Sequence, residues 1–295
     1  ISLITFSYYL LVFEAITQKS RDLTNHLLDH SKTYPKFSFK EAETVKESSQ
    51  AQNLRYKIFK KELKVTTKLK GQVIKREFDQ YDENATHIIV KAKSTPLSLE
   101  KVVGVYRVIK YSSTSQLDNC YTSNSMCFNL DLFKKNIGYS NFLELGRTCI
   151  HPAYRKSGVL KLLWKGLYKY IMQEKIDVLL GCASFWTIEP DEIMPQLSYL
   201  KQNYLMDKKI MVTPRDNISL TVDKLSKCKM YDDFNLHGTE KSIFKSLPSL
   251  IKAYINVGSK FGDGAVIDYE FRSIDVFTYV DIHSIDDRVK RYYAK

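Results

Sequence analysis

The sequence lacks the signals that would place it in several common classes. Its five cysteines are odd in number and show no paired metal-type spacing, so we expect no metal site. Mostly buried thiols in a reducing compartment are the expected alternative. The sequence also has no internal repeat, and the apolar run at residues 1–13 is too short to span a membrane.

The chain has fewer acidic than basic residues, and the resulting positive charge favours acidic partners. The chain has 45 Lys and Arg against 33 Asp and Glu, a net charge of +12. Nucleic acid, an anionic membrane surface and an acidic protein all suit that charge. The sequence has no helix-turn-helix signature and no RNA-binding aromatic motif, so nucleic acid is not expected. The densest basic patch is Arg55–Arg76, whose ordinary interpretation is a solvated helix face.

The N-terminal segment favours two interpretations. Residues 1–13 have no positively charged start and no small-residue cleavage site, which argues against a signal peptide. The run would be an interfacial membrane anchor or a helix packed on the core. The chain begins at Ile1 rather than Met, as a fragment or processed form would. We expect an N-terminal extension over 1–45 and one large domain over 46–295.

The apolar pattern predicts a mixed α/β sheet, built by a hairpin first and a crossover later. Helices are expected at Glu47–Leu63, Leu130–Ile137, Leu247–Val257 and in a basic region ending near Lys209. Strands are expected at Ala85–Ala92, Lys101–Lys110, Leu143–Ile150, Ile176–Ala183 and, closing the sheet, Val276–Ile282. Tyr111–Ser125 is rich in Ser, Thr and Asn, so we expect a surface loop.

The stretch between the strands at Leu143–Ile150 and Ile176–Ala183 carries the main functional signal. A basic loop containing Arg155 and Lys156 precedes an amphipathic helix that opens near Gly158. The unpaired N–H groups and the positive dipole end of that helix would face an anion such as a phosphate. The alternative is a basic loop that only connects a strand to a helix.

Several motifs in order resemble a known family. They are ELGRTCIHPAYRKSG (144–158), LLWKGL (162–167) and GCAS (181–184), with NLRYKIFKKEL (53–63), FDQYDENATHIIV (78–90) and VVGVYRVI (102–109) upstream and residues 247–282 downstream. This pattern resembles the ornithine-lipid-type amino-acid N-acyltransferases of the Gcn5-related N-acyltransferase (GNAT) superfamily, relatives of the acyl-homoserine-lactone synthases. The likeness covers about residues 50 to 290 and weakens in 111–125 and 202–240.

The resemblance implies an α/β GNAT-like fold with an N-terminal extension and a C-terminal helix-strand block. It implies transfer of a (3-hydroxy)fatty acyl group from acyl carrier protein to the α-amine of an amino acid. Ornithine is the leading candidate for that amino acid. No bound cofactor is expected: the acyl-phosphopantetheine of the carrier is a donor substrate, and acyl-CoA is the alternative donor. The basic patch would receive the carrier, and the enzyme would work peripherally on the cytoplasmic face of the membrane.

Two other functions stay open. One is a lactone or acyl-amino-acid signal synthase, and the other is a non-catalytic basic binding protein of the same fold. The lactone synthases have a tryptophan shortly after the position of Phe59, whereas both tryptophans here, Trp164 and Trp186, come much later. That departure counts against a signal synthase.

Glu144 is the expected general base, and Arg147 would position it or the substrate carboxylate. Residues three apart on a regular strand point to opposite faces. The two side chains therefore share a site only if the strand bulges between them, and Gly146 suits a bulge. The alternative is a salt bridge at a strand end.

Further site residues follow from the resemblance. Asp79 and Asp82 would hold an α-amino group or a basic side chain, and Arg55 or Arg107 a carboxylate; the two Asp residues alone would more often mean a turn or helix cap. The expected substrate-binding residues are Arg55, Phe59, Asp79, Asp82 and Arg107. Those expected to bind the phosphopantetheine are Ile150, Arg155, Lys156, Ser157, Gly158 and Val159. Trp164, Tyr168, His87 and His151 are expected in structural roles, with Trp164 and Tyr168 lining an acyl channel as the alternative.

Overall fold

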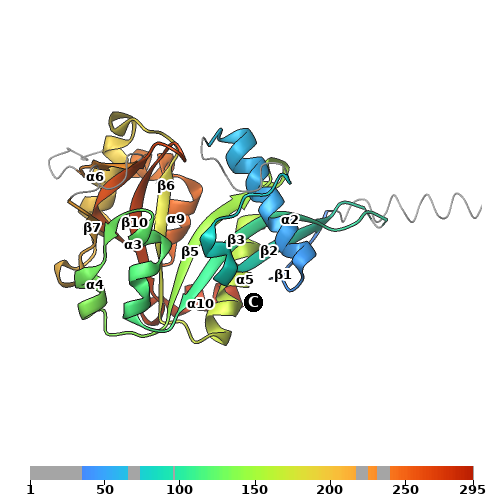
Figure 1. Ribbon diagram of the computed structural model, residues 1–295, viewed down its shortest axis with the longest axis horizontal. Coiled ribbons are helices and arrows are strands. Elements are labelled where there is room, and N and C mark those ends of the chain that lie inside the picture. Colours follow the sequence, from blue (N-terminus) through green and yellow to red (C-terminus); the bar gives the residue numbers. More distant parts are fainter. Residues whose placement is uncertain (1–34, 66–73, 96, 217–224, 231–239, 295) are drawn as a thin grey trace, which may run out of the picture.

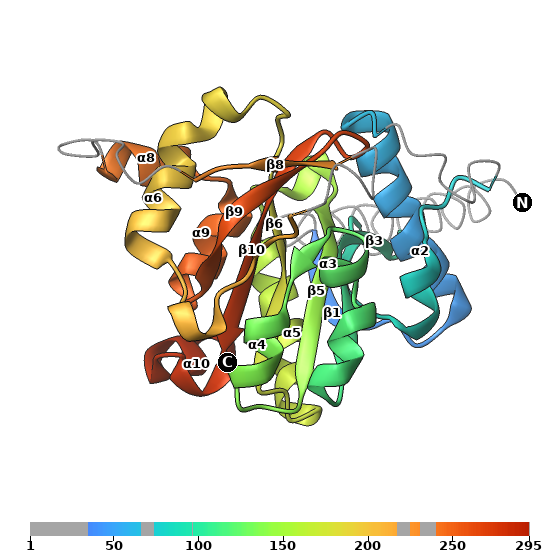
Figure 2. The same cartoon turned by 60° about the vertical axis from the view of Figure 1, so that its left-hand side comes forward.

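A computed structural model describes residues 35–65, 74–95, 97–216, 225–230 and 240–294. Its main sheet has eight strands in the order β1-β2-β3-β5-β6-β10-β9-β8 (Figures 1 and 2). These strands are β1 (Lys36–Glu41), β2 (Thr86–Lys93), β3 (Lys101–Tyr111), β5 (Phe142–Ile150), β6 (Val178–Phe185), β8 (Leu225–Cys228), β9 (Lys260–Asp268) and β10 (Ser273–Asp281). A two-stranded sheet pairs β4 (Phe128–Asn129) with β7 (Thr213–Pro214).

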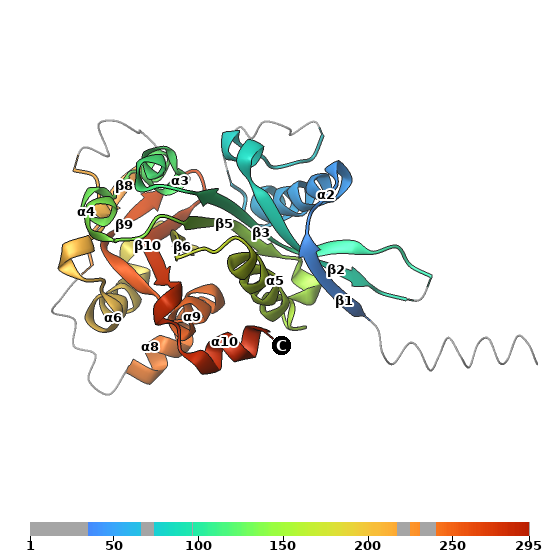
Figure 3. The same ribbon diagram turned by 90° about the horizontal axis from the view of Figure 1, so that it is seen from below.

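Helices cover both faces of the main sheet (Figure 3). One face carries α2 (Val45–Tyr56), α3 (Tyr121–Asn124) and α4 (Asp131–Asn136). The other carries α5 (Val159–Gln173), α6 (Met194–Tyr204), α8 (Glu240–Ser246), α9 (Ser249–Asn256) and α10 (Asp287–Ala294). The single-turn or irregular helices are η1 (Lys57–Glu62), η2 (Gln80–Asn84), η3 (Thr114–Asn119), η4 (Pro152–Tyr154), η5 (Pro190–Ile193), η6 (Lys208–Ile210) and η7 (Ile282–Ser284).

The predicted mixed sheet is confirmed at its centre. β2 and β3 form an antiparallel hairpin and β3 pairs with β5, after which α5 crosses over so that β6 lies parallel to β5. β5 and β6 stay paired only from Phe142↔Val178 to Leu145↔Gly181. Beyond that point β6 is paired with β10 as far as Phe185, while β5 continues beside β3. The two parallel strands therefore separate over their last residues.

A bulge lies in β5 near the point of separation. The β3–β5 register shifts between Val105 and Arg107, so that β5 has an additional residue there. Arg147 takes a left-handed conformation with φ of 52°. The bulge predicted between Glu144 and Arg147 is present, at Arg147 itself rather than at Gly146. It places both side chains on the α3 side of the sheet, where Glu144 and Arg147 each contact Tyr121.

Buried apolar side chains form clusters on both faces of the sheet. The largest packs α5, α6 and α9 on the sheet and includes Trp164, which contacts the rings of Tyr106 and Tyr254. Trp164 is therefore a core residue, as predicted. All five cysteines are unpaired thiols, and four of them are buried, which confirms the expected buried thiols.

The structure corrects three sequence predictions. Tyr111–Ser125 is not a surface loop but contains η3 and α3, with Leu117 and Thr122 fully buried. β10 does not close the sheet, because β9 and β8 lie outside it. The glycines of β9 interrupt the strand pattern, so β9 is not predicted from the sequence. β1 pairs along its whole length with β2, so the sheet begins no later than Lys36 and the division at residue 45 cuts through it.

Part of the expected N-terminal extension (1–34) and of the basic patch (66–73) lies outside the described residues. Within the described part of the chain, every helix is too short or too polar to cross a bilayer.

Candidate active site

A cavity of about 520 Å³ occupies the gap where β5 and β6 separate. The wall on β5 runs from Leu145 to Ile150, and Cys182 and Ser184 contribute the wall on β6. The remaining walls come from η1, α3, α9 and the β9–β10 hairpin. This volume is within the range of small-molecule sites, and the lining mixes apolar side chains with a few charged ones. Of the predicted site residues, Phe59, Arg147, Ile150 and Arg155 line the cavity.

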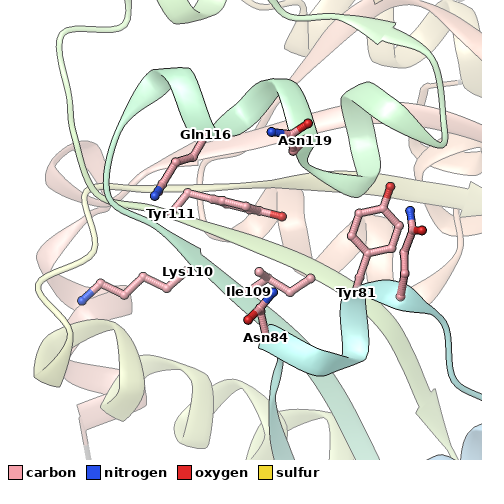
Figure 4. Close-up of a pocket in the computed structure, with 8 residues that line it drawn as sticks. Tyr81, Asn84, Ile109, Lys110, Tyr111, Gln116 and Asn119 are labelled. Carbon is pink, nitrogen blue, oxygen red and sulfur yellow. The ribbon is translucent and has the colours of Figure 1, made fainter.

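A second cavity, of about 570 Å³, lies between η2, η3 and the end of β3. Figure 4 shows the side chains that line it, among them the polar Asn84, Gln116 and Asn119. No carboxylate lines it among the described residues, and its only cation, Lys110, is paired with Glu174. Tyr81, which lines this cavity, packs edge-to-face on Tyr121, which lines the first one. The two cavities are thus neighbours separated by an aromatic wall.

The predicted anion loop lies at the mouth of the first cavity. Gly158 has a φ of 81° and is followed directly by the 15-residue helix α5. A left-handed residue at this position suits glycine, and the first N–H groups of α5 are directed outward from the helix start. Arg155 pairs with Glu62 across the mouth, at 2.6 Å. Lys156, Ser157 and Gly158 are exposed, whereas Val159 is buried in the core.

Arg147 is held on the cavity wall by two rings and two carboxylates. Its guanidinium carbon lies 4.7 Å from the ring centre of Tyr121 and 4.4 Å from that of Phe271. Its Nε donates to Glu77 at 3.1 Å and its Nη2 to Asp79 at 2.9 Å. A left-handed arginine costs conformational energy, and such strain gathers at functional sites. These four contacts fix the orientation of the guanidinium on the wall.

The predicted substrate-binding charges do come together, in a buried network beside the cavity. Arg55 is 0% exposed and donates to Glu77 and to both oxygens of Asp82. Arg107 donates from Nη1 to Asp79 at 2.6 Å and to Asp82 at 3.2 Å. With Arg147, three guanidinium groups meet three carboxylates, so the network is balanced without a substrate.

This network also explains the spacing of the two aspartates. Asp79 is the N-cap of η2, accepting from Tyr81 N, while Asp82 accepts from Asp79 N. The capping interpretation is therefore confirmed. His87 lies against Asp82 with a pKa lowered by burial. The pKa of Asp82 is lowered by its hydrogen bonds from His87 and Arg55, although burial acts in the opposite direction. Arg55, Asp82 and Arg107 do not line either cavity. They contact the carboxylates that hold Arg147 or their partners, and so stabilise the cavity wall indirectly.

Glu144 has an anchoring geometry. It is 3% exposed and accepts hydrogen bonds from Tyr111 Oη at 3.0 Å, Tyr121 N at 3.0 Å, and both N and Oγ1 of Thr122 at 2.7 Å. These bonds tie the start of α3 to β5. Glu144 does not line the cavity and forms no ion pair with Arg147 among the described residues. Its role as general base stays a prediction, and its contacts favour an anchor.

Three carboxylates of the site were missed from the sequence. Glu77 is fully buried and bridges Arg55 and Arg147. Asp268 and Asp275 belong to the β9–β10 hairpin and line the cavity. The signal that could have revealed Asp275 is a charged residue inside the apolar run SIDVFTYV, because unpaired charges rarely enter a core strand.

Asp275 is a buried carboxyl on the cavity wall with a raised proton affinity. It is 4% exposed, and its carboxyl accepts hydrogen bonds from Ser184 Oγ and, at 2.7 Å, from Ser273 Oγ. Burial raises its pKa to about 6, with a further rise from the nearby Asp268. The hydroxyl of Ser184 and the charge of Arg147 act in the opposite direction. A carboxyl with a pKa near neutrality can both accept and release a proton under physiological conditions.

Comparison with known proteins places this arrangement in context. The chain is 30% identical over 254 residues to the L-ornithine N(alpha)-acyltransferase of Rhizobium meliloti, covering 86% of this chain and 82% of that protein. It is 30% identical over 258 residues to the protein of the same name from Agrobacterium fabrum, covering 86% and 83% of the two chains. An acetyltransferase (GNAT) domain model matches residues 54–165, which run from α2 through β5 into α5.

The solved structures that match this chain include a CoA-dependent acyl-homoserine lactone synthase. It is 12% identical, with a TM-score of 0.44, and covers 88% of each chain. An N-acyl amino acid synthase from uncultured soil microbes is 8% identical, with a TM-score of 0.38, covering 85% of this chain and 93% of the other.

Proposed function

Because this chain belongs to the L-ornithine N(alpha)-acyltransferase family and has a GNAT-type fold, we propose that it acylates the α-amine of ornithine. The product would be an acylornithine, a lyso-type amino-acid lipid. For the donor we propose a fatty acyl group, 3-hydroxylated, on the phosphopantetheine of acyl carrier protein. We further propose that the enzyme works at the cytoplasmic face of the membrane, where such a product would partition.

The separation of β5 and β6 is the observation that supports this function best. Beyond Leu145, β5 has no register partner on β6, so its backbone groups on that side are available to an extended pantetheine arm. The anion loop with Arg155 and the start of α5 lies at the mouth, suited to the phosphate of that arm. Backbone N–H groups between Arg147 and Ile150 would stabilise the oxyanion of the thioester.

Arg147 is the proposed site for the substrate carboxylate. The two rings and the two carboxylates hold its guanidinium in one orientation. Its Nε and Nη2 donate to Glu77 and Asp79, so Nη1 is the group that would donate to the substrate carboxylate. The buried charges behind it, Arg55, Asp79, Asp82 and Arg107, would keep that orientation. Phe59, which contacts Trp186 and Phe271 at the other wall, would pack on the acyl donor.

The direct test is thiol release from 3-hydroxyacyl carrier protein in the presence of single amino acids, with the mass of the product measured. Ornithine should give thiol release and a product heavier than ornithine by the acyl group. Lysine and glycine provide matched acceptors that differ in side-chain length and charge. The same acyl chain on coenzyme A separates the carrier requirement from the acyl requirement.

Turnover with ornithine from either donor would support the family activity, and a preference for the carrier-bound donor would support the carrier assignment. Folded protein that releases no thiol with ornithine from either donor would contradict the proposal.

A further inference from the structure

We propose that Asp275 is the proton acceptor for the α-ammonium group of the amino-acid substrate, which binds across the gap between β5 and β6 with its carboxylate on Arg147. This inference rests on the proposed function and deepens it. It assigns to the β9–β10 hairpin a catalytic group that neither the sequence motifs nor the comparisons identify.

The position of Asp275 relative to the two strands supports this role. Its register partner on β6 is Ser184, which lies beyond the last β5–β6 pair, at Gly181. Asp275 and Ser184 therefore stand on one wall of the cavity, while Arg147 stands on the other wall, beyond Leu145 on β5. A zwitterion needs an anion for its ammonium and a cation for its carboxylate, and these two side chains supply them on facing walls.

Two hydroxyl contacts hold Asp275 in one rotamer. Ser184 Oγ donates to Oδ1 and Ser273 Oγ donates to Oδ2, so each carboxyl oxygen has one partner. A carboxylate oxygen has two lone pairs, which leaves acceptor capacity for an ammonium. The neighbouring acid, Asp268, has a structural role instead, because its Oδ1 accepts the backbone N–H groups of Glu270 and Phe271 at 2.8 Å and so fixes the hairpin turn.

The charged and titratable groups around Asp275 set its proton affinity. Asp268 on β9 raises its pKa, and Arg147 on β5 lowers it. Burial raises the pKa of Cys182 on β6 and of Tyr121 on α3, and the charge of Asp275 raises both further. Both groups therefore stay neutral. The pKa of Asp275 thus lies at about 6, whereas the pKa values of Cys182, Tyr121 and Arg147 are all raised above their usual values.

The reaction balances with Asp275 in this role. Asp275 takes one proton from the α-ammonium, and the neutral nitrogen attacks the thioester carbonyl carbon, forming the C–N bond and an oxyanion. When the oxyanion collapses, the C–S bond breaks and the thiolate leaves with the electron pair. The second nitrogen proton passes to that thiolate, and Asp275 releases its own proton to water after the product leaves.

The test compares Asp275→Asn with the wild-type protein in turnover and in calorimetric binding of L-ornithine. In the wild type, kcat/KM should fall as pH drops below about 6, because a protonated Asp275 accepts no proton. Asp275→Asn should lose that acidic limb and at least about 100-fold in kcat/KM at pH 7. Its rate should recover as pH rises toward the pKa of the substrate amine, since the solvent then supplies neutral amine. Binding of ornithine should weaken at least about tenfold.

Ser184→Ala provides a variant with the carboxyl retained. Loss of the Ser184 hydroxyl removes a contact that lowers the pKa of Asp275, so the acidic limb should move to higher pH. Asp281→Asn, on the same strand but outside the cavity, is the matched control and should leave the profile unchanged.

The possible failures are distinct. Wild-type turnover with an Asp275→Asn variant that keeps its rate and acidic limb would overturn the Asp275 assignment alone. Wild-type binding of ornithine without turnover would overturn the proposed function, and the loss of binding in Asp275→Asn would still support the contact. A wild-type protein that neither binds nor acylates ornithine would overturn both.

Discussion

Buried carboxylates in this protein differ in what satisfies them, and that difference separates structural from chemical roles. Glu77 and Asp82 are matched by arginine, and Glu144 by backbone and hydroxyl donors. Asp275 has two hydroxyl donors, and burial raises its pKa to about 6. A carboxylate that is fully satisfied is a poor base, because protonation would break its bonds. The incompletely satisfied Asp275 is the better candidate.

Glu144→Gln should destabilise the protein more than it affects chemistry. The glutamine carries one acceptor oxygen, and its amide would face backbone and hydroxyl donors at the start of α3. We expect a loss of about 1–3 kcal/mol in the free energy of unfolding, measured by urea titration. The acidic limb of the pH–rate profile should persist near pH 6.

If Glu144→Gln instead removes the acidic limb and turnover while stability is unchanged, Glu144 is the general base. That result would also contradict the assignment of Asp275. The pair Glu144→Gln and Asp275→Asn therefore separates the two candidates in one set of measurements.

At the scale of elements, the cavity exists because two parallel strands pair for four residues and then separate. The final pair is Leu145 and Gly181, and the close contact there requires glycine. A Cβ at Gly181 would lie 2.4 Å from the carbonyl oxygen of Leu145, a backbone atom that cannot rotate away. The separation thus begins directly after a point where the strands approach closely.

Gly181→Ala should force β5 and β6 apart before the natural point of separation. We expect a loss of about 2–4 kcal/mol in the free energy of unfolding, together with weaker binding of the acyl donor. Urea titrations with and without donor measure both effects. Gly146→Ala is the matched control for stability, because its Cβ would meet only the Arg107 guanidinium, at 3.8 Å. Equal stability of the two variants would contradict the close-contact explanation.

At the scale of the whole molecule, the net charge of +12 favours an acidic partner. The structure shows which of the basic residues near the cavity are exposed to such a partner. Arg55 is buried, Arg76 donates to Gln52, and Lys60 donates to the carbonyl of Val65, so these charges are engaged internally. Lys57 and Lys61 are exposed on η1, the segment whose Phe59 and Glu62 line the cavity. A carrier docked there would bring its pantetheine to the mouth.

Lys57→Glu combined with Lys61→Glu should lower kcat/KM for the carrier-bound donor about tenfold at low salt. The same acyl group on coenzyme A should be affected far less, and the defect should shrink as salt rises. The control is Lys241→Glu with Lys245→Glu, two exposed lysines on α8 that do not line the cavity. Equal losses in both double variants would indicate a general charge effect rather than a docking surface.

The central elements of the sheet and the family follow from the sequence alone. Apolar periodicity located the β2–β3 hairpin, the crossover through α5 and the strand β6, because those patterns are local. Ordered motifs such as ELGRTCIHP carried the resemblance to the N-acyltransferases, which the relatives at 30% identity confirm. The mostly buried thiols and the helix-capping role of Asp79 were also predictable from short-range patterns.

The tertiary structure alone decided which charges face the cavity. The sequence offers both Arg55 and Arg147 as partners of the substrate carboxylate, yet Arg55 is buried in the network and Arg147 lies on the cavity wall. Asp275 lies 128 positions after Arg147, and only the insertion of β10 beside β6 brings it to the site. Pairing between distant strands, and the burial that shifts a pKa, depend on contacts that no local pattern contains.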